Sequence, residues 1–400
     1  MGDRSTRPTR VSRREVLKTL GTAGAAGLAG CTSLSGGSGD NTVVVGSSAP
    51  LSGAYAISGK RIRNEVELAG EHAVEDGDID GFDLLIEDNG TDPAEATRIA
   101  RQQLDDGADY IVAGLSGQST SAVARVADRE GAIHLGSTSV PELDTEQCFP
   151  NTFKISKGLP AWGWNTVGYG LENGFGDSVY EIALDAPYPQ SMLAYNRDTL
   201  VPGVGGEHVG STTVPFSAND FSQALTEARE SGADIVNFVM FGGPLLSALK
   251  QADEFGYPDE GIVVSSGSIT SDFAEPMIDS IQTYDRALFG IVGCYYGLDT
   301  PANNTFVEQY RDAYDSLPGS STWYQGTRTL LAASGAAGTT DTDATREALR
   351  GRELTPQLFD TGERFRACDN RMTIPSLTVQ GRPLDEVEDG DFWEVVDTND

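Results

Sequence analysis

Short segments rich in serine, threonine and glycine follow several β-branched runs, and they hold the side chains of this sequence best suited to ligand chemistry. They span residues 47–56, 115–120 and 136–139 in the first half, and 185–188, 241–244 and 265–268 in the second. Ser119 or Thr120 can cap a following helix, whose first N–H groups have no intrahelical partner. A helix N-terminus with hydroxyls nearby suits an anion such as a carboxylate.

Alternating strand and helix patterns must position these segments. The expected strands span residues 42–46, 82–87, 109–114, 132–136, 179–184, 208–214, 234–240, 261–265 and 287–293. The expected helices span residues 60–75, 94–105, 119–130, 161–173, 190–200, 220–231, 245–255, 305–317 and 324–337. This alternation predicts an α/β fold with two lobes, each built on a parallel sheet covered by helices. Ligands of open parallel sheets bind beyond the carboxyl ends of the strands, where the serine-rich segments lie.

Motifs of the common enzyme classes are missing from the sequence. It has neither a G-x-S-x-G nucleophile elbow nor a Walker A phosphate loop. The three histidines are His72, His134 and His208, and no cysteine–histidine cluster has ligand spacing, so we expect no metal and no cofactor. His134 lies within a strand pattern and is expected in the core. A secreted α/β hydrolase is therefore a weaker interpretation than a binding protein.

The charge of the chain is strongly unbalanced. Its 400 residues include 60 acidic and 28 basic side chains, which gives a net charge of −32. Such a surface repels nucleic acid, so no nucleic-acid partner is expected. The acidic residues are spread along the chain, which is typical of a halophilic protein, because high salt screens their mutual repulsion.

The first thirty residues have the pattern of an export signal. Residues 12–18, Ser-Arg-Arg-Glu-Val-Leu-Lys, resemble a twin-arginine motif, and residues 28–31, Leu-Ala-Gly-Cys, resemble a lipobox. We therefore expect a twin-arginine lipoprotein signal over residues 1–30, a lipid on Cys31 and a flexible linker over residues 31–41. The protein is then expected at the extracellular face of the cell membrane, held by its lipid anchor.

Six further segments resemble the branched-chain amino acid, urea and amide-binding type of periplasmic solute-binding protein, the leucine-binding protein-like family of ABC transporters. They span residues 49–56, 139–143, 184–189, 249–256, 304–310 and 365–370. The resemblance extends from residue 42 to about residue 385. It implies two Rossmann-like lobes with parallel sheets, joined by three hinge crossings near Ile155, Ala287 and Cys368. Lobe 1 would comprise residues 42–155 and 288–368, and lobe 2 residues 156–287 and 369–400.

The resemblance also implies a ligand site between the lobes and a disulfide between Cys148 and Cys368, with Cys294 a free thiol. The candidate ligand-binding residues, taken from the strand ends and the matching loops, are Tyr55, Ser58, Ser116, Gln118, Ser119, Ser137, Thr138, Ser139, Tyr188, Phe241 and Ser266. Amino-acid binders of this family hold the ligand ammonium with an acid where this sequence has Ser266 and Gly267. Urea, a short amide or a carboxylate without an amine therefore stand beside an amino acid as candidate ligands.

Together these features predict a monomeric, lipid-anchored receptor that captures a small polar solute for the permease subunits of an ABC importer. Hinge closure around the ligand would be its mechanism. An extracellular ligand sensor of the same fold is the alternative, because the sequence carries nothing that separates transport from signalling.

Overall fold

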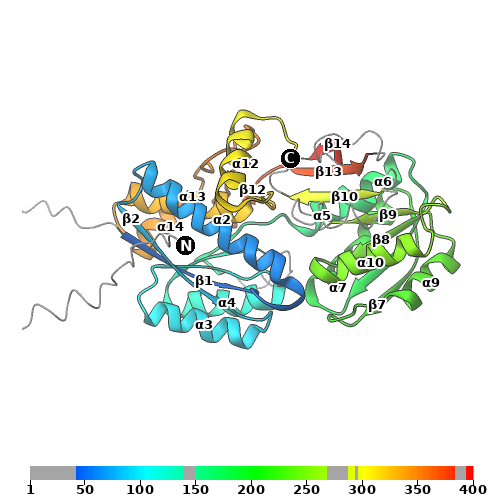
Figure 1. Cartoon of the computed structure of the whole chain (residues 1–400), viewed down its shortest axis with the longest axis horizontal. Helices are drawn as coiled ribbons and strands as arrows, with labels where there is room; N and C mark the ends of the chain where they lie inside the picture. Colours follow the sequence, from blue (N-terminus) through cyan, green and yellow to red (C-terminus); the bar gives the residue numbers. More distant parts are fainter. Residues whose placement is uncertain (1–41, 138–148, 268–286, 293–295, 383–392, 400) are drawn as a thin grey trace, which may run out of the picture. The chain divides into compact units, whose positions relative to one another are not determined.

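The computed structural model describes residues 42–137, 149–267, 287–292, 296–382 and 393–399. Figure 1 shows the described chain as helices and strands in two sheets. The expected alternation of strands and helices is confirmed over both sheets. A two-stranded hairpin, β11 (Arg364–Phe365) with β12 (Met372–Thr373), accompanies them.

The first sheet is entirely parallel, with the strand order β2-β1-β3-β4-β5. Its strands are β1 (Thr42–Ala49), β2 (Gly81–Asp88), β3 (Tyr110–Ala113), β4 (Ile133–Gly136) and β5 (Thr152–Lys154). Its helices are α2 (Ala56–Glu75), α3 (Pro93–Asp105), α4 (Gly117–Glu130), α12 (Pro301–Tyr314), α13 (Thr322–Ala337) and α14 (Thr342–Leu349), with the short η1 (Gly53–Tyr55) before α2.

Strand β3 shows how this sheet is buried on both faces. Tyr110 and Val112 point into a core that includes apolar residues of α2 and α13. Ile111 and Ala113 point the other way, into a core formed with α3 and α4. Figure 1 accordingly shows α3 and α4 together on one side of β1, with α2 on the other. Burial on both faces explains why β3 has no polar alternation.

The second sheet has the strand order β14-β13-β10-β9-β8-β6-β7. Its strands are β6 (Ser178–Leu184), β7 (Glu207–Val214), β8 (Ile235–Val239), β9 (Val263–Ser266), β10 (Leu288–Val292), β13 (Ser376–Gly381) and β14 (Trp393–Asn399). Its helices are α5 (Leu159–Gly163), η3 (Trp164–Gly168), α6 (Tyr169–Glu172), α7 (Pro187–Tyr195), η4 (Asn196–Leu200), α8 (Val201–Gly203), α9 (Ser222–Ser231) and α10 (Gly242–Glu254). Strands β6 to β10 are parallel, whereas β13 and β14 add an antiparallel pair that sequence analysis did not predict.

The pairing of β10 differs from the lobe boundary expected at residues 287 and 288. Leu288 and Phe289 pair with β9, and the whole of β10 pairs with β13, so this strand belongs to the second sheet. Helices α13 and α14 belong to the first sheet, because the Tyr110 hydroxyl is 2.9 Å from hydroxyls on both. The chain therefore passes between sheets after β5, after β10, and between β12 and β13.

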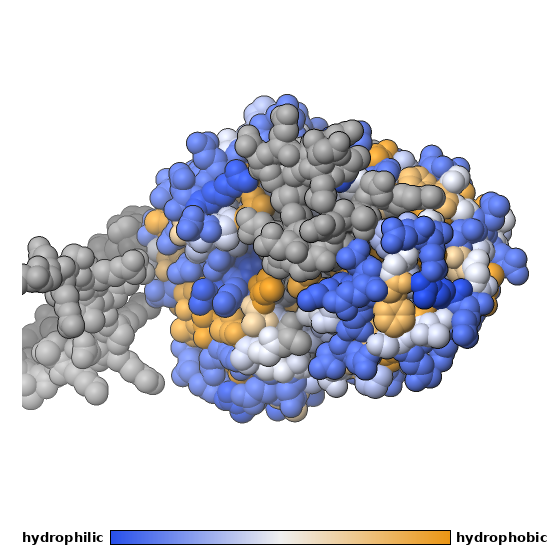
Figure 2. Space-filling model, turned by 45° about the vertical axis from the view of Figure 1, so that its right-hand side comes forward, coloured by the Kyte–Doolittle hydropathy of each residue, from blue (hydrophilic) through white to orange (hydrophobic). Residues whose placement is uncertain are grey.

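The surface is largely hydrophilic on the face shown in Figure 2, with apolar atoms exposed only in small patches. Among the described side chains, Ile57 and Val74 are the large apolar ones that are exposed, by 39% and 37%. None of the described helices combines the length and the apolar character needed to cross a bilayer.

Candidate functional site

The first wall of the candidate site is the loop that follows β1. The Leu51 N–H donates a hydrogen bond to the Asp88 carboxylate (2.8 Å), which ties the loop to the end of β2. Gly59 of α2 lies against the same loop, since a Cβ there would be 1.9 Å from the Pro50 carbonyl oxygen. The loop then turns through η1 and brings Tyr55 to an interior position, where 3% of the residue is exposed.

The N-terminus of α4 forms the floor beside this loop. Ser116 caps the helix: its Oγ accepts from the Ser119 N–H (3.1 Å), and its hydroxyl donates to Ser119 Oγ (3.0 Å). The Thr120 hydroxyl bonds to the carbonyls of Ser116 (2.9 Å) and Ser137 (3.2 Å), which holds the turn against the end of β4. Because Ser119 Oγ accepts from Ser116, its own proton remains to be donated. The first amides of α4 add further donors at this point.

Aromatic rings from the second sheet form the opposite wall. Phe216 follows β7, and Phe241 follows β8. The Tyr55 ring stacks on Phe216, with centroids 5.3 Å apart and 23° between the planes, and lies 5.2 Å from Phe241. Phe216 and Phe241 are 6.2 Å apart, and Tyr188 at the start of α7 lies 6.5 Å from Phe241. Tyr55 is thus a first-lobe side chain seated among second-lobe rings.

A narrow pocket lies where these walls meet, and we call it the Tyr55 pocket. It is lined by Pro50, Tyr55, Asn89, Thr91, Leu115, Ser116, Ser119, Phe216 and Phe241. None of these side chains is charged. The free space here has room for about one water-sized group, so a solute can enter only if the lining side chains or the two lobes move apart.

The Tyr55 hydroxyl is the least satisfied polar group of this pocket. It is buried and has no hydrogen-bond partner among the described residues. Burial raises the pKa of Tyr55, so the phenol stays protonated at neutral pH and acts as a donor. Leaving such a group unpaired costs about 1–3 kcal/mol, which a ligand acceptor would recover.

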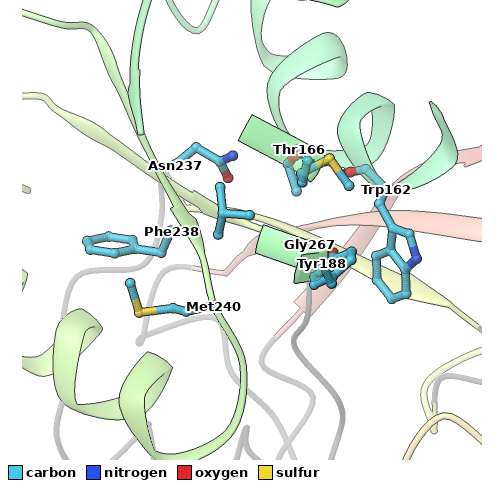
Figure 3. Close-up of a pocket in the computed structure, with 9 residues that line it drawn as sticks. Trp162, Thr166, Tyr188, Asn237, Phe238, Met240 and Gly267 are labelled. Carbon is cyan, nitrogen blue, oxygen red and sulfur yellow. Dashed lines mark hydrogen bonds between the residues drawn. The ribbon is translucent and has the colours of Figure 1, made fainter. Parts of the chain in front are cut away.

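A second narrow pocket lies within the second lobe, and we call it the Trp162 pocket. It is lined by Trp162, Thr166, Tyr188, Met192, Asn237, Phe238, Val239, Met240 and Gly267. Figure 3 shows the side chains of Phe238 and Met240 pointing away from Thr166 and Trp162, while Asn237 points toward Thr166. Phe238 and Met240 belong to the apolar core, so they line the pocket from behind.

The structure brings together only some of the predicted site residues. Four of them line the Tyr55 pocket, namely Tyr55, Ser116, Ser119 and Phe241, while Tyr188 lines the Trp162 pocket. Ser58 is buried in α2 outside both linings, and Gln118 is exposed. Thr138 and Ser139 lie outside the described residues.

The remaining two predicted residues, Ser137 through its backbone and Ser266 through its hydroxyl, make hydrogen bonds within the protein. Ser137 is half-buried, donates its N–H to the Gly114 carbonyl and accepts from Thr120. Ser266 is fully buried, and its hydroxyl donates to the Phe238 carbonyl (2.9 Å). Its neighbour Gly267 lines the Trp162 pocket instead.

Sequence analysis missed several lining residues that its own rule would have found. Asn89 and Thr91 follow the expected strand 82–87, and Phe216 follows the expected strand 208–214. All three lie beyond the carboxyl ends of strands. The sequence analysis selected only strand-end segments rich in serine, threonine and glycine, and these three residues lie outside them. Trp162, within the expected helix 161–173, also lines a pocket.

The histidines give no sign of catalysis or metal binding in the described residues. His134 is fully buried, as expected, and burial lowers its pKa to about 4. Its Nε2 is 2.8 Å from the Ala113 carbonyl oxygen and donates to it, so Nε2 carries a proton, while the lowered pKa keeps the ring neutral at pH 7. The described part of the chain holds no group of three His, Cys, Asp or Glu side chains placed to bind a metal ion.

The cysteines differ from the expected pairing. Cys368 has an exposed free thiol, with its Sγ 3.7 Å from an Asp369 carboxylate oxygen. The disulfide predicted between Cys148 and Cys368 is therefore absent at Cys368. Cys148, Cys294 and Cys31 lie outside the described residues.

Known proteins share this architecture. The periplasmic binding protein family matches residues 42–386. A Leu/Ile/Val-binding protein homolog 8 of Brucella abortus (strain 2308) is 25% identical over 309 residues, which cover 73% of this chain and 75% of that protein. A periplasmic binding protein from Burkholderia mallei aligns with a TM-score of 0.80 at 23% identity, over 90% of this chain and 95% of the other.

A solute-binding protein of an ABC transporter from Rhodopseudomonas palustris BisB5, solved with 3,4-dihydroxybenzoic acid, aligns with a TM-score of 0.76. The two are 20% identical over 89% of this chain and 96% of the other. These structures share the fold, and the family match spans nearly all of the described chain. The chain therefore belongs to the periplasmic binding protein family, whose members bind solutes and are not enzymes.

Proposed function

We propose that this protein is the solute-binding component of an ABC importer, and that the Tyr55 pocket captures a small polar metabolite. The observation that carries the proposal is the composition of that pocket. Loops after three strands of the first sheet and two strands of the second line it together. A pocket made by both lobes is the arrangement that hinge closure requires, because a ligand there stabilises only the closed state.

The donors of the Tyr55 pocket favour a carboxylate as the recognised group. The Tyr55 phenol, the Ser119 hydroxyl and the first amides of α4 all offer protons. The helix dipole adds partial positive charge at the same point. An anion would accept from several of these donors at once, whereas an ammonium group would meet donors only.

Two related proteins point to carboxylic acids as ligands. The Brucella relative is named for leucine, isoleucine and valine, and the Rhodopseudomonas structure contains a dihydroxybenzoic acid. All four compounds are small carboxylic acids. A small carboxylate, with or without an amine, is therefore the first class of solute to test, and urea and short amides follow.

The location follows from the export signal of the sequence. The twin-arginine motif would carry a folded monomer across the membrane, and a lipid on Cys31 would hold it at the extracellular face beside its permease. Net acidity over the mature surface suits a high-salt medium.

The test is a ligand screen, followed by a measurement of ligand uptake through the permease. Thermal shift of the full-length protein in molar salt would be measured with amino acids, aromatic carboxylates, urea and short amides. A rise in midpoint that grows with concentration identifies the ligand class. Uptake of that ligand by cells should then depend on the protein and on the permease. Binding without any uptake would overturn the importer and favour a sensor.

A further inference from the structure

Tyr55 belongs to the first lobe by its backbone but contacts the second lobe with its ring. The 3-10 helix η1 ends at Tyr55 and leads directly into α2, and the Leu51 N–H ties the preceding loop to Asp88 at the end of β2. The ring lies 5.3 Å from Phe216 and 5.2 Å from Phe241, both of the second lobe. When the lobes move apart at this point, the ring separates from both neighbours.

The ring of Tyr55 is more deeply buried than the two rings that it contacts. Tyr55 is 3% exposed, whereas Phe216 and Phe241 are half-buried. Aromatic pairs gain free energy both from the burial of apolar surface and from the geometry of the rings. Because the partners lie on different lobes, this gain stabilises the closed arrangement of the lobes.

The ring contacts form without a solute, and they leave little space. The Tyr55 pocket has room for about one water-sized group, so a solute enters only after Tyr55 has moved away from its neighbours. The Tyr55 hydroxyl opposes closure, because it is buried without a partner among the described residues. The closed arrangement therefore depends on the ring, and the unpaired hydroxyl makes it easier to release.

We propose that Tyr55 is an intramolecular latch, whose ring keeps the two lobes closed over the Tyr55 pocket in the absence of solute. The latch regulates the binding site of the proposed function and rests on that function. The ligand-free protein is then mostly closed, with a minor open population that admits the solute. The apparent affinity is reduced in proportion to that small open fraction.

Single-molecule energy transfer on the ligand-free, full-length protein tests the latch without any solute. One dye is placed on Arg101 of α3 and the other on Glu230 of α9, two exposed positions on different lobes, each replaced by a non-natural side chain. Tyr55→Ala removes both ring contacts, so the ratio of open to closed molecules should rise at least about fivefold. Tyr55→Phe keeps the ring and should be no more open than the wild type.

Opposite results overturn the latch. They are an unchanged ratio in a folded Tyr55→Ala protein, or an equal rise in Tyr55→Phe. Phe216→Ala removes the stacking ring from the other lobe, so it should also raise the ratio, and it serves as the test if Tyr55→Ala does not fold.

Phe175→Ala is the matched control. It removes a ring of the Tyr169–Phe175 pair, which lies in the second lobe outside the lining of the Tyr55 pocket. The ratio of open to closed molecules should stay unchanged in this variant. An equal rise in Phe175→Ala and Tyr55→Ala would trace the opening to a general loosening of the lobes and overturn the latch.

A solute found by the ligand screen gives a second test. The observed association rate should level off at high solute concentration, at the rate of ring release, and Tyr55→Ala should raise this plateau. A wild-type rate that stays proportional to concentration overturns the latch. If solutes bind and the lobes of Tyr55→Ala stay closed, only the latch fails. If no solute binds, the proposed function fails, while energy transfer still decides whether Tyr55 keeps the lobes closed.

Discussion

The two walls of the Tyr55 pocket are built differently. On the first-lobe side, α3 and α4 begin at side-chain caps, Asp92 and Ser116, and hydrogen bonds fix each loop. On the second-lobe side, α7 and α10 begin without a side-chain cap; Phe241 stands at the N-cap of α10, and Tyr188 lies in the first turn of α7. The first wall therefore offers directional hydrogen-bond donors, and the second offers the faces of aromatic rings. Charge recognition and shape selection are separated between the lobes.

The largest effect should come from displacing the polar wall. Gly59→Ala places a Cβ 1.9 Å from the Pro50 carbonyl oxygen, so the loop that carries Tyr55 must shift. We expect a loss of stability of at least about 1–3 kcal/mol, as for overpacking, and a loss of ligand affinity above about tenfold. Thermal melts and calorimetry measure the two.

Gly335→Ala is the matched control for that change. Its Cβ would lie 1.9 Å from the Asp78 carbonyl oxygen, an equal clash in the same lobe but away from the pocket. It should lose stability and keep affinity. If both variants lose the same affinity, the loss comes from general destabilisation of the lobe and not from the loop after β1. The contrast between the two walls would then be wrong.

Removing the unpaired donor should have the next largest effect. Tyr55→Phe keeps the ring and its stacking on Phe216 but deletes the buried hydroxyl. Affinity for a carboxylate should fall by about 0.5–1.5 kcal/mol, roughly threefold to tenfold, while the unliganded protein becomes no less stable. Tyr314→Phe is the control, because that hydroxyl donates to the Asn64 carbonyl (2.9 Å). It should lower stability and leave affinity unchanged; the reverse pattern would refute the role of Tyr55.

Changing the aromatic wall should alter selectivity more than affinity. Phe216→Leu keeps an apolar side chain but loses the ring that stacks on Tyr55, an interaction worth about 0.5–1.5 kcal/mol. Binding of flat ligands should weaken a few-fold relative to branched ones, as measured by competition. Phe175→Leu, in a Tyr169–Phe175 pair outside both pockets, should leave the ratio unchanged. A uniform loss for all ligands would show that the ring selects nothing.

The smallest effect is a dependence on acid. The hydrogen bond from Ser52, with those from Gly90 and Leu51, lowers the pKa of Asp88 below its unfolded value of 3.8. A carboxylate with a lowered folded pKa stabilises the fold above the unfolded pKa, and that stabilisation is lost as the pH falls through the folded pKa. Below about pH 4 the melting midpoint should therefore fall less steeply in Asp88→Asn than in the wild type.

Asp220 provides the second-lobe counterpart of Asp88. The Ser222 N–H lowers its pKa at the start of α9. Asp220→Asn should also flatten the midpoint curve. Only Asp88→Asn should change how ligand affinity responds to acid, because Asp88 holds the loop before Tyr55. If ligand affinity responds to acid equally in both variants, Asp88 has no special effect on the site.

The sequence was sufficient for most local structure and for part of the lining of the Tyr55 pocket. Alternating apolar patterns located the strands and helices of both sheets, and the strand-end rule found Tyr55, Ser116, Ser119 and Phe241. It also selected Gln118, whose side chain is exposed beside Ser119 on the first turn of α4 and lies outside both pocket linings. A capping motif fixes the turn but does not show which of its side chains faces inward.

Information that depends on distant pairing was not available from local pattern. The position of β10 in the second sheet is set by its bonds to β9 and β13, and β13 begins 84 residues after β10 ends, at Ser376 after Val292. The ring contacts of Phe216 likewise join elements more than 150 residues apart, since Tyr55 lies on the other lobe. Both features follow from tertiary contacts that no local period encodes.

The repeated passage of the chain between the sheets has a consequence for how the protein is made. A ribosome that has released residues 42–154 has supplied every strand of the first sheet, yet α13 and α14, which cover one of its faces, are still missing. The second sheet waits for β14, at the far end of the described chain. Neither lobe can be completed while the nascent chain is short, so a premature stop before α14 leaves both lobes unfinished.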